Sequence, residues 1–223
     1  MKRAAAACCL LAASVLPAAA QSGASRVEVS VGGGLLGGAG VGSASADLRT
    51  NEPGRKPFPL FSAASRIARG RALHARALVP LSARVAVEGG LTVSHPDLVT
   101  SVSLDAEGAP PLTVTERIDQ YVIDAGVRVM LDGLRLGASL TPFVAAGAGY
   151  LRQLHEGQTV IEHGQAYYAG GGLTYPLLGR DRGFVRAAGL RADARVYLMR
   201  GGVAFGDRPR PHAAVSGGAF IGF

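Results

Sequence analysis

The five histidines are the side chains in this sequence best suited to proton transfer or metal binding. Ser94 precedes His95, a pair of residue types that nucleophilic catalysis uses, and His155 and His163 each adjoin a glutamate, which suits a general base. The sequence has no G-x-S-x-G motif, and the separation of eight residues between His155 and His163 is not a recognised spacing for metal ligands. We therefore predict loop salt bridges at these histidines, with no enzymatic activity, no bound metal and no cofactor.

Charged side chains that recur at every second position form another group. Between residues 121 and 131, Asp124 and Arg128 share one face while apolar residues occupy the other, and residues 84–93 and 190–199 repeat the pattern. Successive side chains of a β-strand point to opposite faces, so each segment would have one apolar and one charged face. Enclosed charges must be paired or hydrated. The residues predicted to form an interior charge network are Arg84, Glu88, Asp124, Arg128, Arg191, Asp193 and Arg195.

The N-terminus has the features of a secretory signal peptide. Lys2 and Arg3 precede an apolar stretch over residues 4–16, and small residues follow up to Ala20. Cleavage after Ala20 would remove residues 1–20, leave residues 21–223 as one domain, and lower the formal net charge from +7 to +5. Both cysteines, at positions 8 and 9, lie in the removed segment. We therefore expect an exported protein without disulfides.

Period-two alternation continues along the mature chain. The longest uncharged stretch, residues 29–46, contains seven glycines, so we expect no helix to span a membrane. Turn residues divide the chain into eight predicted strands, and an even number returns both termini to one side of a barrel. The predicted strands cover residues 26–46, 58–79, 83–104, 112–131, 141–154, 159–178, 184–205 and 211–223. Their polar outer halves are expected to project beyond the bilayer as a collar.

A soluble β-sandwich also alternates, so the C-terminus is informative. Apolar residues alternate from Ala213 to the final residue, Phe223. This ending, with the signal peptide and the cysteine-free mature chain, resembles Gram-negative outer-membrane β-barrels of the eight-stranded, OmpA/OmpW-like kind. The resemblance covers nearly all of residues 21–223.

The resemblance implies an all-β fold, an eight-stranded antiparallel up-and-down transmembrane β-barrel in the outer membrane. It implies contact with outer-membrane lipid and lipopolysaccharide, and insertion by the barrel-assembly machinery through the C-terminal strand, with Phe223 as the assembly signal. The absence of tryptophan departs from the usual aromatic girdles. The aromatic residues left to supply a girdle are Tyr121, Phe143, Tyr150, Tyr167, Tyr168, Tyr175, Phe184, Phe220 and Phe223.

An eight-stranded barrel is only wide enough for its own side chains or one small ligand. We therefore interpret the charged interior as a salt-bridged plug in a monomeric barrel with a structural or surface-binding role. The first alternative is a narrow channel for small or hydrophobic solutes, in which arginines and carboxylates exchange partners. The second is a barrel enzyme that modifies lipid A.

A basic segment between residues 49 and 76 contains a single acid, Glu52. Guanidinium groups match phosphate geometry well, so this segment could contact lipopolysaccharide; the alternative is a solvated charge run that partly points into the lumen. Nucleic acid is not expected as a partner, because no aromatic platform is interleaved with these cations. The candidate lipopolysaccharide-binding residues are Arg49, Arg55, Lys56, Arg66, Arg69 and Arg71.

Overall fold

The computed structural model describes residues 27–48, 56–103, 108–134, 140–156, 160–180, 183–204 and 208–223. These residues form antiparallel strands and one short 3₁₀ turn, η1 (Asp132–Leu134). The strands are β1 (Glu28–Leu36), β2 (Ala39–Leu48), β3 (Phe58–Ile67), β4 (Gly70–Pro80), β5 (Val85–Ser94), β6 (Asp97–Ser103), β7 (Leu112–Met130), β8 (Thr141–His155), β9 (Ile161–Gly179), β10 (Ala187–Gly201) and β11 (Arg210–Gly222). Within the described ranges, no helix is long and apolar enough to cross a membrane.

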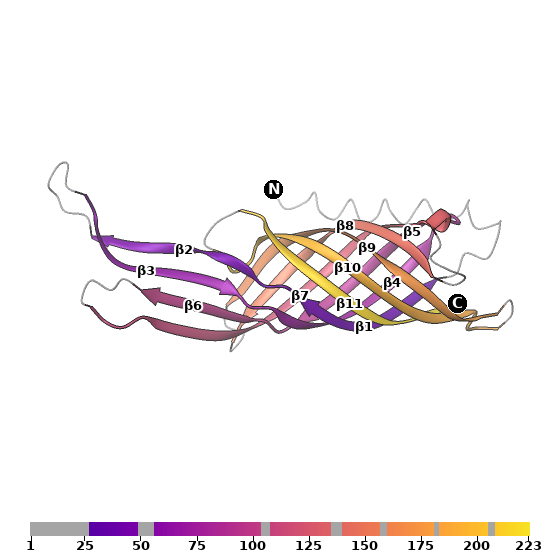
Figure 1. Ribbon diagram of the computed structural model, residues 1–223, viewed down its shortest axis with the longest axis horizontal. Helices are drawn as coiled ribbons and strands as arrows, with labels where there is room; N and C mark the ends of the chain where they lie inside the picture. Colours follow the sequence, from indigo (N-terminus) through magenta and orange to yellow (C-terminus); the bar gives the residue numbers. More distant parts are fainter. Residues whose placement is uncertain are drawn as a thin grey trace.

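Eight strands close into a barrel (Figure 1). They pair in antiparallel fashion in the order β1, β4, β5, β7, β8, β9, β10 and β11, and β11 pairs with β1. Closure removes the free sheet edges that lipid could not satisfy with hydrogen bonds. The predicted all-β, eight-stranded antiparallel barrel is confirmed. The predicted signal peptide, residues 1–20, lies outside the described residues.

Three of the predicted strands are each divided in two. The breaks separate β1 from β2, β3 from β4, and β5 from β6. Backbone segments approach closely at these breaks: a Cβ atom at Gly38 would meet the carbonyl oxygen of Ile67, and one at Gly70 would lie 3.1 Å from the Cα of Pro96. Pro96 also has no amide hydrogen to contribute to a ladder. The three breaks therefore lie at one level along the barrel axis. We call this level the outer rim of the barrel.

The barrel has the inverse polarity of a soluble protein. Outward positions are apolar from Leu73 to Val79 on β4 and from Ile123 to Val129 on β7, whereas the charged residues within these two segments are buried. Large apolar side chains exposed on the outside include Val31, Leu73, Leu91, Ile123, Val144, Leu190 and Val215. This distribution is that of a β-barrel whose outside faces lipid and whose lumen is polar.

The aromatic residues divide between the two faces. Tyr150 and Tyr167 are exposed toward the outer rim, and Tyr175 and Phe184 are exposed toward the end that holds the C-terminus. Tyr167 and Tyr175 are eight residues apart on β9, which is roughly 26 Å along a strand at ~3.3 Å per residue. These residues can flank an apolar band. The girdle assignment is wrong for three residues that occupy inward positions of their strands, namely Phe143, Tyr168 and Phe220.

A second sheet projects beyond the outer rim on one side only (Figure 1). It consists of β2, β3, β6 and residues 112–117 of β7, in that order, with β2 at its edge. We call it the projecting sheet. The polar outer halves of the strands therefore do not form the expected collar around the barrel, because only the first four predicted strands extend far past the rim.

Candidate functional site: a charged lumen closed by successive layers

Glu88 is the centre of the ion pairs inside the barrel. Its carboxylate accepts hydrogen bonds from Arg195 at 2.5 Å, from Arg191 at 2.8 Å and from Arg76 at 3.3 Å. All four side chains are buried, and they come from β4, β5 and β10. Three cations on one carboxylate would repel one another, so further anions are needed nearby.

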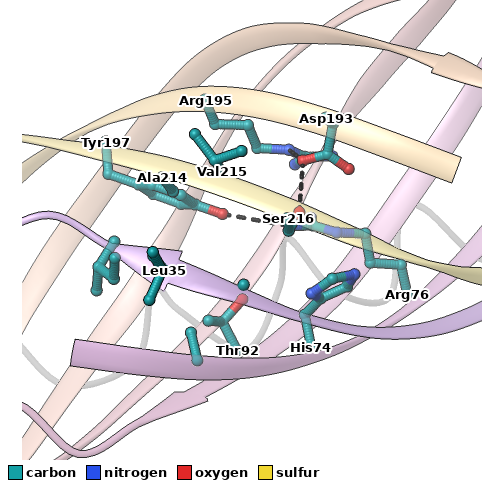
Figure 2. Close-up of a pocket in the computed structure, with 13 residues that line it drawn as sticks. Leu35, His74, Arg76, Thr92, Asp193, Arg195, Tyr197, Ala214, Val215 and Ser216 are labelled. Atoms are coloured by element: carbon teal, nitrogen blue, oxygen red, sulfur yellow. Dashed lines mark hydrogen bonds and ion pairs between the residues drawn. The ribbon is translucent and has the colours of Figure 1, made fainter.

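Asp193 and Asp124 supply that negative charge. Asp193 lies between Arg191 and Arg195 at every second position of β10 and accepts a hydrogen bond of 3.1 Å from the Nε of each. The hydroxyl of Ser216 on β11 also donates to Asp193 at 3.1 Å (Figure 2). An oxygen of Asp124 lies 3.6 Å from Arg76.

A fourth arginine lies on the inner side of this cluster, toward the C-terminal end of the barrel. Arg128 of β7 contacts the carboxylate of Glu28 at 3.1 Å. Four arginines therefore face four carboxylates, and the formal charges balance. We call this set the lumen network; its members are Glu28, Arg76, Glu88, Asp124, Arg128, Arg191, Asp193 and Arg195.

Aromatic rings fill the space between the guanidinium groups. The ring of Phe143 lies between Arg128 and Arg191, with guanidinium carbons 4.3 Å and 4.7 Å from its centroid. Arg195 lies 4.6 Å from the ring centroid of Tyr168. Such contacts stabilise cations that are removed from water.

Interior glycines make room for these rings. A Cβ atom at Gly147 would lie 2.7 Å from the Tyr168 ring, and one at Gly172 would lie 2.6 Å from the Phe143 ring. A cavity of about 20 Å³ beside Arg76 and Asp193 has room for about one water molecule (Figure 2). The network layer is therefore filled.

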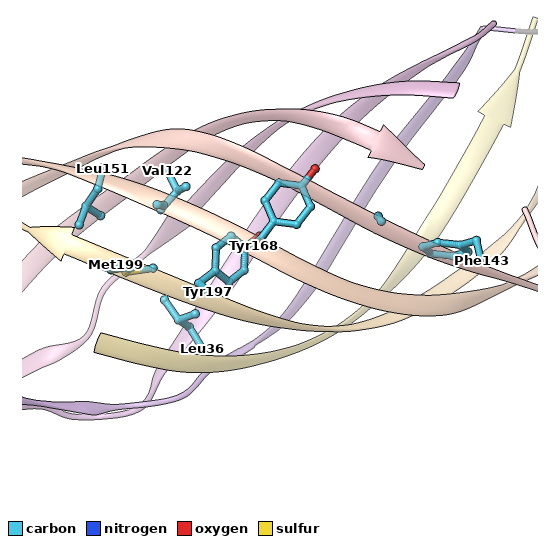
Figure 3. Close-up of a cluster of buried hydrophobic side chains, with 9 residues drawn as sticks. Leu36, Val122, Phe143, Leu151, Tyr168, Tyr197 and Met199 are labelled. Atoms are coloured by element: carbon cyan, nitrogen blue, oxygen red, sulfur yellow. The ribbon is translucent and has the colours of Figure 1, made fainter. Parts of the chain in front are cut away.

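An apolar layer covers the network on its outer side. Tyr168 and Tyr197 pack with ring centroids 5.7 Å apart (Figure 3). The larger non-aromatic side chains of this buried cluster are Leu36, Val122, Leu151 and Met199. An ion would have to lose its hydration shell to cross this layer.

Residues 202–204, which follow β10, cover the outer mouth. Gln153 donates to Gln120 at 2.6 Å, while the Gln153 side-chain oxygen accepts from the backbone N–H of Val203 at 2.9 Å. Arg210 donates to the carbonyls of Gly201 and Val203, at 2.5 Å and 2.8 Å. Val203 and Ala204 then pack against a second buried cluster, Val41, Ile67, Leu98 and Ile118, at the base of the projecting sheet.

A larger cavity opens at the inner mouth. It measures about 220 Å³ and lies against the Arg128–Glu28 pair, with Met130, Thr174 and Phe220 among its lining residues. The lumen is therefore accessible from its inner end as far as the network and filled beyond it.

The structure brings together six of the seven residues predicted for the interior: Glu88, Asp124, Arg128, Arg191, Asp193 and Arg195. The prediction is wrong for Arg84. Its side chain is 72% exposed and lies 3.7 Å from Asp132, because it precedes β5 in a turn where strand alternation no longer applies. Two members of the network were missed. Arg76 follows the period of β4, and Glu28 that of β1, so the same alternation could have identified both.

The candidate lipopolysaccharide-binding residues do not form one group. Arg66, Arg69 and Arg71 are exposed near the rim and make no ion pair with any described residue. Lys56 precedes β3 at the far end of the projecting sheet, so the length of that strand separates it from Arg66. Arg49 and Arg55 lie outside the described residues.

His95, His155 and His163 do not pair with the residues next to them in the sequence. His95 contacts Asp119 at 2.9 Å, and His155 contacts Glu116 at 2.9 Å, both across strands. His163 stacks on and hydrogen-bonds Tyr150. Among the residues that the structure describes, no three His, Cys, Asp or Glu side chains are placed to hold a metal ion.

Phe223 follows the last strand. Its backbone N–H donates to the carbonyl of Val27 at 2.9 Å, and its ring lies 4.9 Å from that of Phe184. The role of Phe223 as an assembly signal stays a prediction.

No protein-family model matches the chain, and no curated protein matches it in sequence. Solved structures that cover most of it include the following three. The outer membrane protein OprG from Pseudomonas aeruginosa is 13% identical, with 90% of this chain and 98% of that chain covered and a TM-score of 0.49. The attachment invasion locus protein Ail of Yersinia pestis is 15% identical, with 88% and 98% covered and a TM-score of 0.36. The outer membrane protease OmpT from Escherichia coli is 6% identical, with 91% and 99% covered and a TM-score of 0.42.

Proposed function

We propose that this chain is an outer-membrane β-barrel with a closed lumen, whose role is structural or binding and whose projecting sheet lies at the cell surface. The filled lumen carries the proposal. Four arginines and four carboxylates neutralise one another around Glu88. The apolar layer and the cap at Val203 lie on the outer side of these charges.

The apolar outside of the barrel supports the membrane location. Outward positions from Leu73 to Val79 and from Ile123 to Val129 carry no charge, as contact with lipid requires. Because the start of β1, the end of β11 and the short turn after β4 lie at one end, the projecting sheet lies at the opposite end. We place both termini in the periplasm, so this opposite end is outside the cell.

Planar-bilayer recordings test the closed lumen. Purified protein should produce no reproducible single-channel steps in potassium chloride. The double variant Tyr197→Ala/Met199→Ala removes two large side chains of the apolar layer but leaves the filled network layer in place, so it should also produce no steps. Reproducible steps from the unchanged protein that change in size in Arg128→Gln would instead support the narrow channel.

A lipopolysaccharide contact is a second role that a specific observation favours. Arg66, Arg69 and Arg71 are exposed, unpaired with described residues, and lie at the rim directly above the apolar band. Lipid phosphates lie at such a boundary, and the guanidinium fork suits them. Arg66 and Arg71 sit at outward positions of β3 and β4, so both can face a surrounding lipid layer.

A further inference from the structure

The polarity of the strands reverses where they leave the barrel. β7 is continuous from residue 112 to residue 130, so its even-numbered residues keep one face throughout. Within the barrel this face carries Asp124 and Arg128 toward the lumen. In the projecting sheet the same face carries Leu112 and Val114, and at its base Glu116, which is paired with His155 at 2.9 Å.

Cross-strand pairing extends this face over the whole projecting sheet, and the hydroxyl groups that it carries, on Ser65 and Thr100, hydrogen-bond each other at 2.8 Å. Residues that pair directly lie on the same face. One row across the four strands consists of Ala44, Ala63, Val102 and Leu112, and the row nearer the barrel consists of Gly42, Ser65, Thr100 and Val114. The opposite face carries hydroxyl groups and charge in the rows of Ser43, Ala64, Ser101 and Thr113 and of Gly40, Arg66, Val99 and Thr115.

Of the residues that the structure describes, Val203 and Ala204 cover the base of the apolar face. There they pack against Ile67 and Leu98. Farther from the barrel the large side chains are open to solvent: Phe61 is 43% exposed, Val114 is 51% exposed and Leu112 is 61% exposed. A one-sided apolar sheet that stands in water is typical of a surface with a partner.

We propose that this apolar face binds the same face of a second copy of the chain that is anchored in an opposing membrane. The inference rests on the proposed function, because it needs the projecting sheet outside the cell. The row that contains Leu112 and the row that contains Val114 have no charged residue, so two identical faces can meet there without repulsion between like charges.

Geometry favours an opposing membrane over a neighbouring copy in the same one. The apolar face is continuous with the lumen side of β7, so it looks across the mouth of its own barrel. A neighbouring barrel with the same orientation would have to occupy the place of the first barrel to bring its own sheet against that face. A copy that approaches upside down meets no such obstacle. The protein therefore stays the predicted monomer within one membrane and pairs only between membranes.

The size of the face suits a weak, reversible contact. Four strands spaced ~4.8 Å apart, with six to ten residues of ~3.3 Å each, give the whole face an area of roughly 500 Å² per copy, including the covered base. Two copies would bury at most about 1,000 Å², which is the lower limit for a specific interface. Many such contacts between two membranes would act together, as multivalent binding does.

Vesicle clustering tests the proposal. The full mature chain is reconstituted into two populations of phosphatidylcholine–phosphatidylglycerol vesicles, one with a donor lipid dye and the other with an acceptor. We expect energy transfer to rise only when both populations contain the protein. Clustering with protein-free vesicles would show binding to lipid, and no clustering at all would show that the faces do not pair. Either result overturns the proposal.

Two substitutions at adjacent positions of β7 locate the contact. Val114→Asp places a charge on the apolar face and should weaken clustering by about tenfold. Thr115→Asp places the same charge on the opposite face and should leave clustering unchanged. Equal loss in both variants, or no loss in Val114→Asp, would overturn the proposal. Heat-modifiable gel mobility verifies that both variants fold.

A labelling experiment separates failure of this inference from failure of the proposed function. Because signal cleavage would remove Cys8 and Cys9, the variant Thr115→Cys would carry a single thiol. A membrane-impermeant maleimide should label that thiol on intact cells. Labelled cells with vesicles that fail to cluster would overturn only the contact between copies. Unlabelled cells would overturn the surface location and therefore both proposals.

Discussion

At the scale of single residues, Glu88 determines whether the lumen can hold its cations. It accepts from three arginines and is fully buried, so Glu88→Gln would leave an uncompensated positive charge beside Arg191 and Arg195. Loss of one partner from a buried ion pair costs about 3–5 kcal/mol. We expect a fall of that order in the free energy of unfolding, measured by urea titration of the protein folded in lipid vesicles.

Arg84→Gln is the matched control for Glu88→Gln. Arg84 contacts Asp132 at the surface, where an exposed ion pair contributes at most about 1 kcal/mol. Equal effects of the two substitutions would contradict the central role of Glu88.

At the scale of elements, the junction of β3 and β4 brings three exposed cations to the rim. If Arg66, Arg69 and Arg71 bind lipid phosphates, their combined replacement by Gln should weaken binding of purified lipopolysaccharide about tenfold or more, and weaken it most at low salt. Binding can be measured in detergent by the quenching of dye-labelled lipopolysaccharide. The double variant Arg84→Gln/Arg186→Gln removes cations at the inner end and should bind normally. An unchanged affinity in the triple variant would exclude this phosphate site.

At the scale of the whole molecule, assembly depends on the C-terminal strand that closes β1 against β10. If Phe223 is the assembly signal, Phe223→Ser should reduce the heat-modifiable protein recovered in the outer-membrane fraction several-fold. Phe184→Ser removes the same ring contact from the other side but leaves the chain terminus intact, so it should assemble normally. Equal losses in the two variants would indicate that Phe223 acts by packing alone.

The sequence by itself determined which face of β5, β7 and β10 is enclosed, because strand alternation is a local property of the backbone. It therefore identified the burial of Glu88, Asp124 and Asp193, and it predicted eight strands and their antiparallel closure. It was wrong for Arg84 because alternation stops where a strand stops, and the start of β5 depends on hydrogen bonds to its neighbours.

Only the tertiary structure decided which enclosed charges meet. The distance from Glu88 to Arg195 depends on the register of strands that lie on different sides of the barrel, and register is set by pairing around the whole ring. The exposure of one face of the projecting sheet also depends on how the strands pair around the barrel. Alternation assigned Val114 to the same face as Asp124, but only closure of the barrel below the rim shows that one is enclosed and the other is left open to a partner.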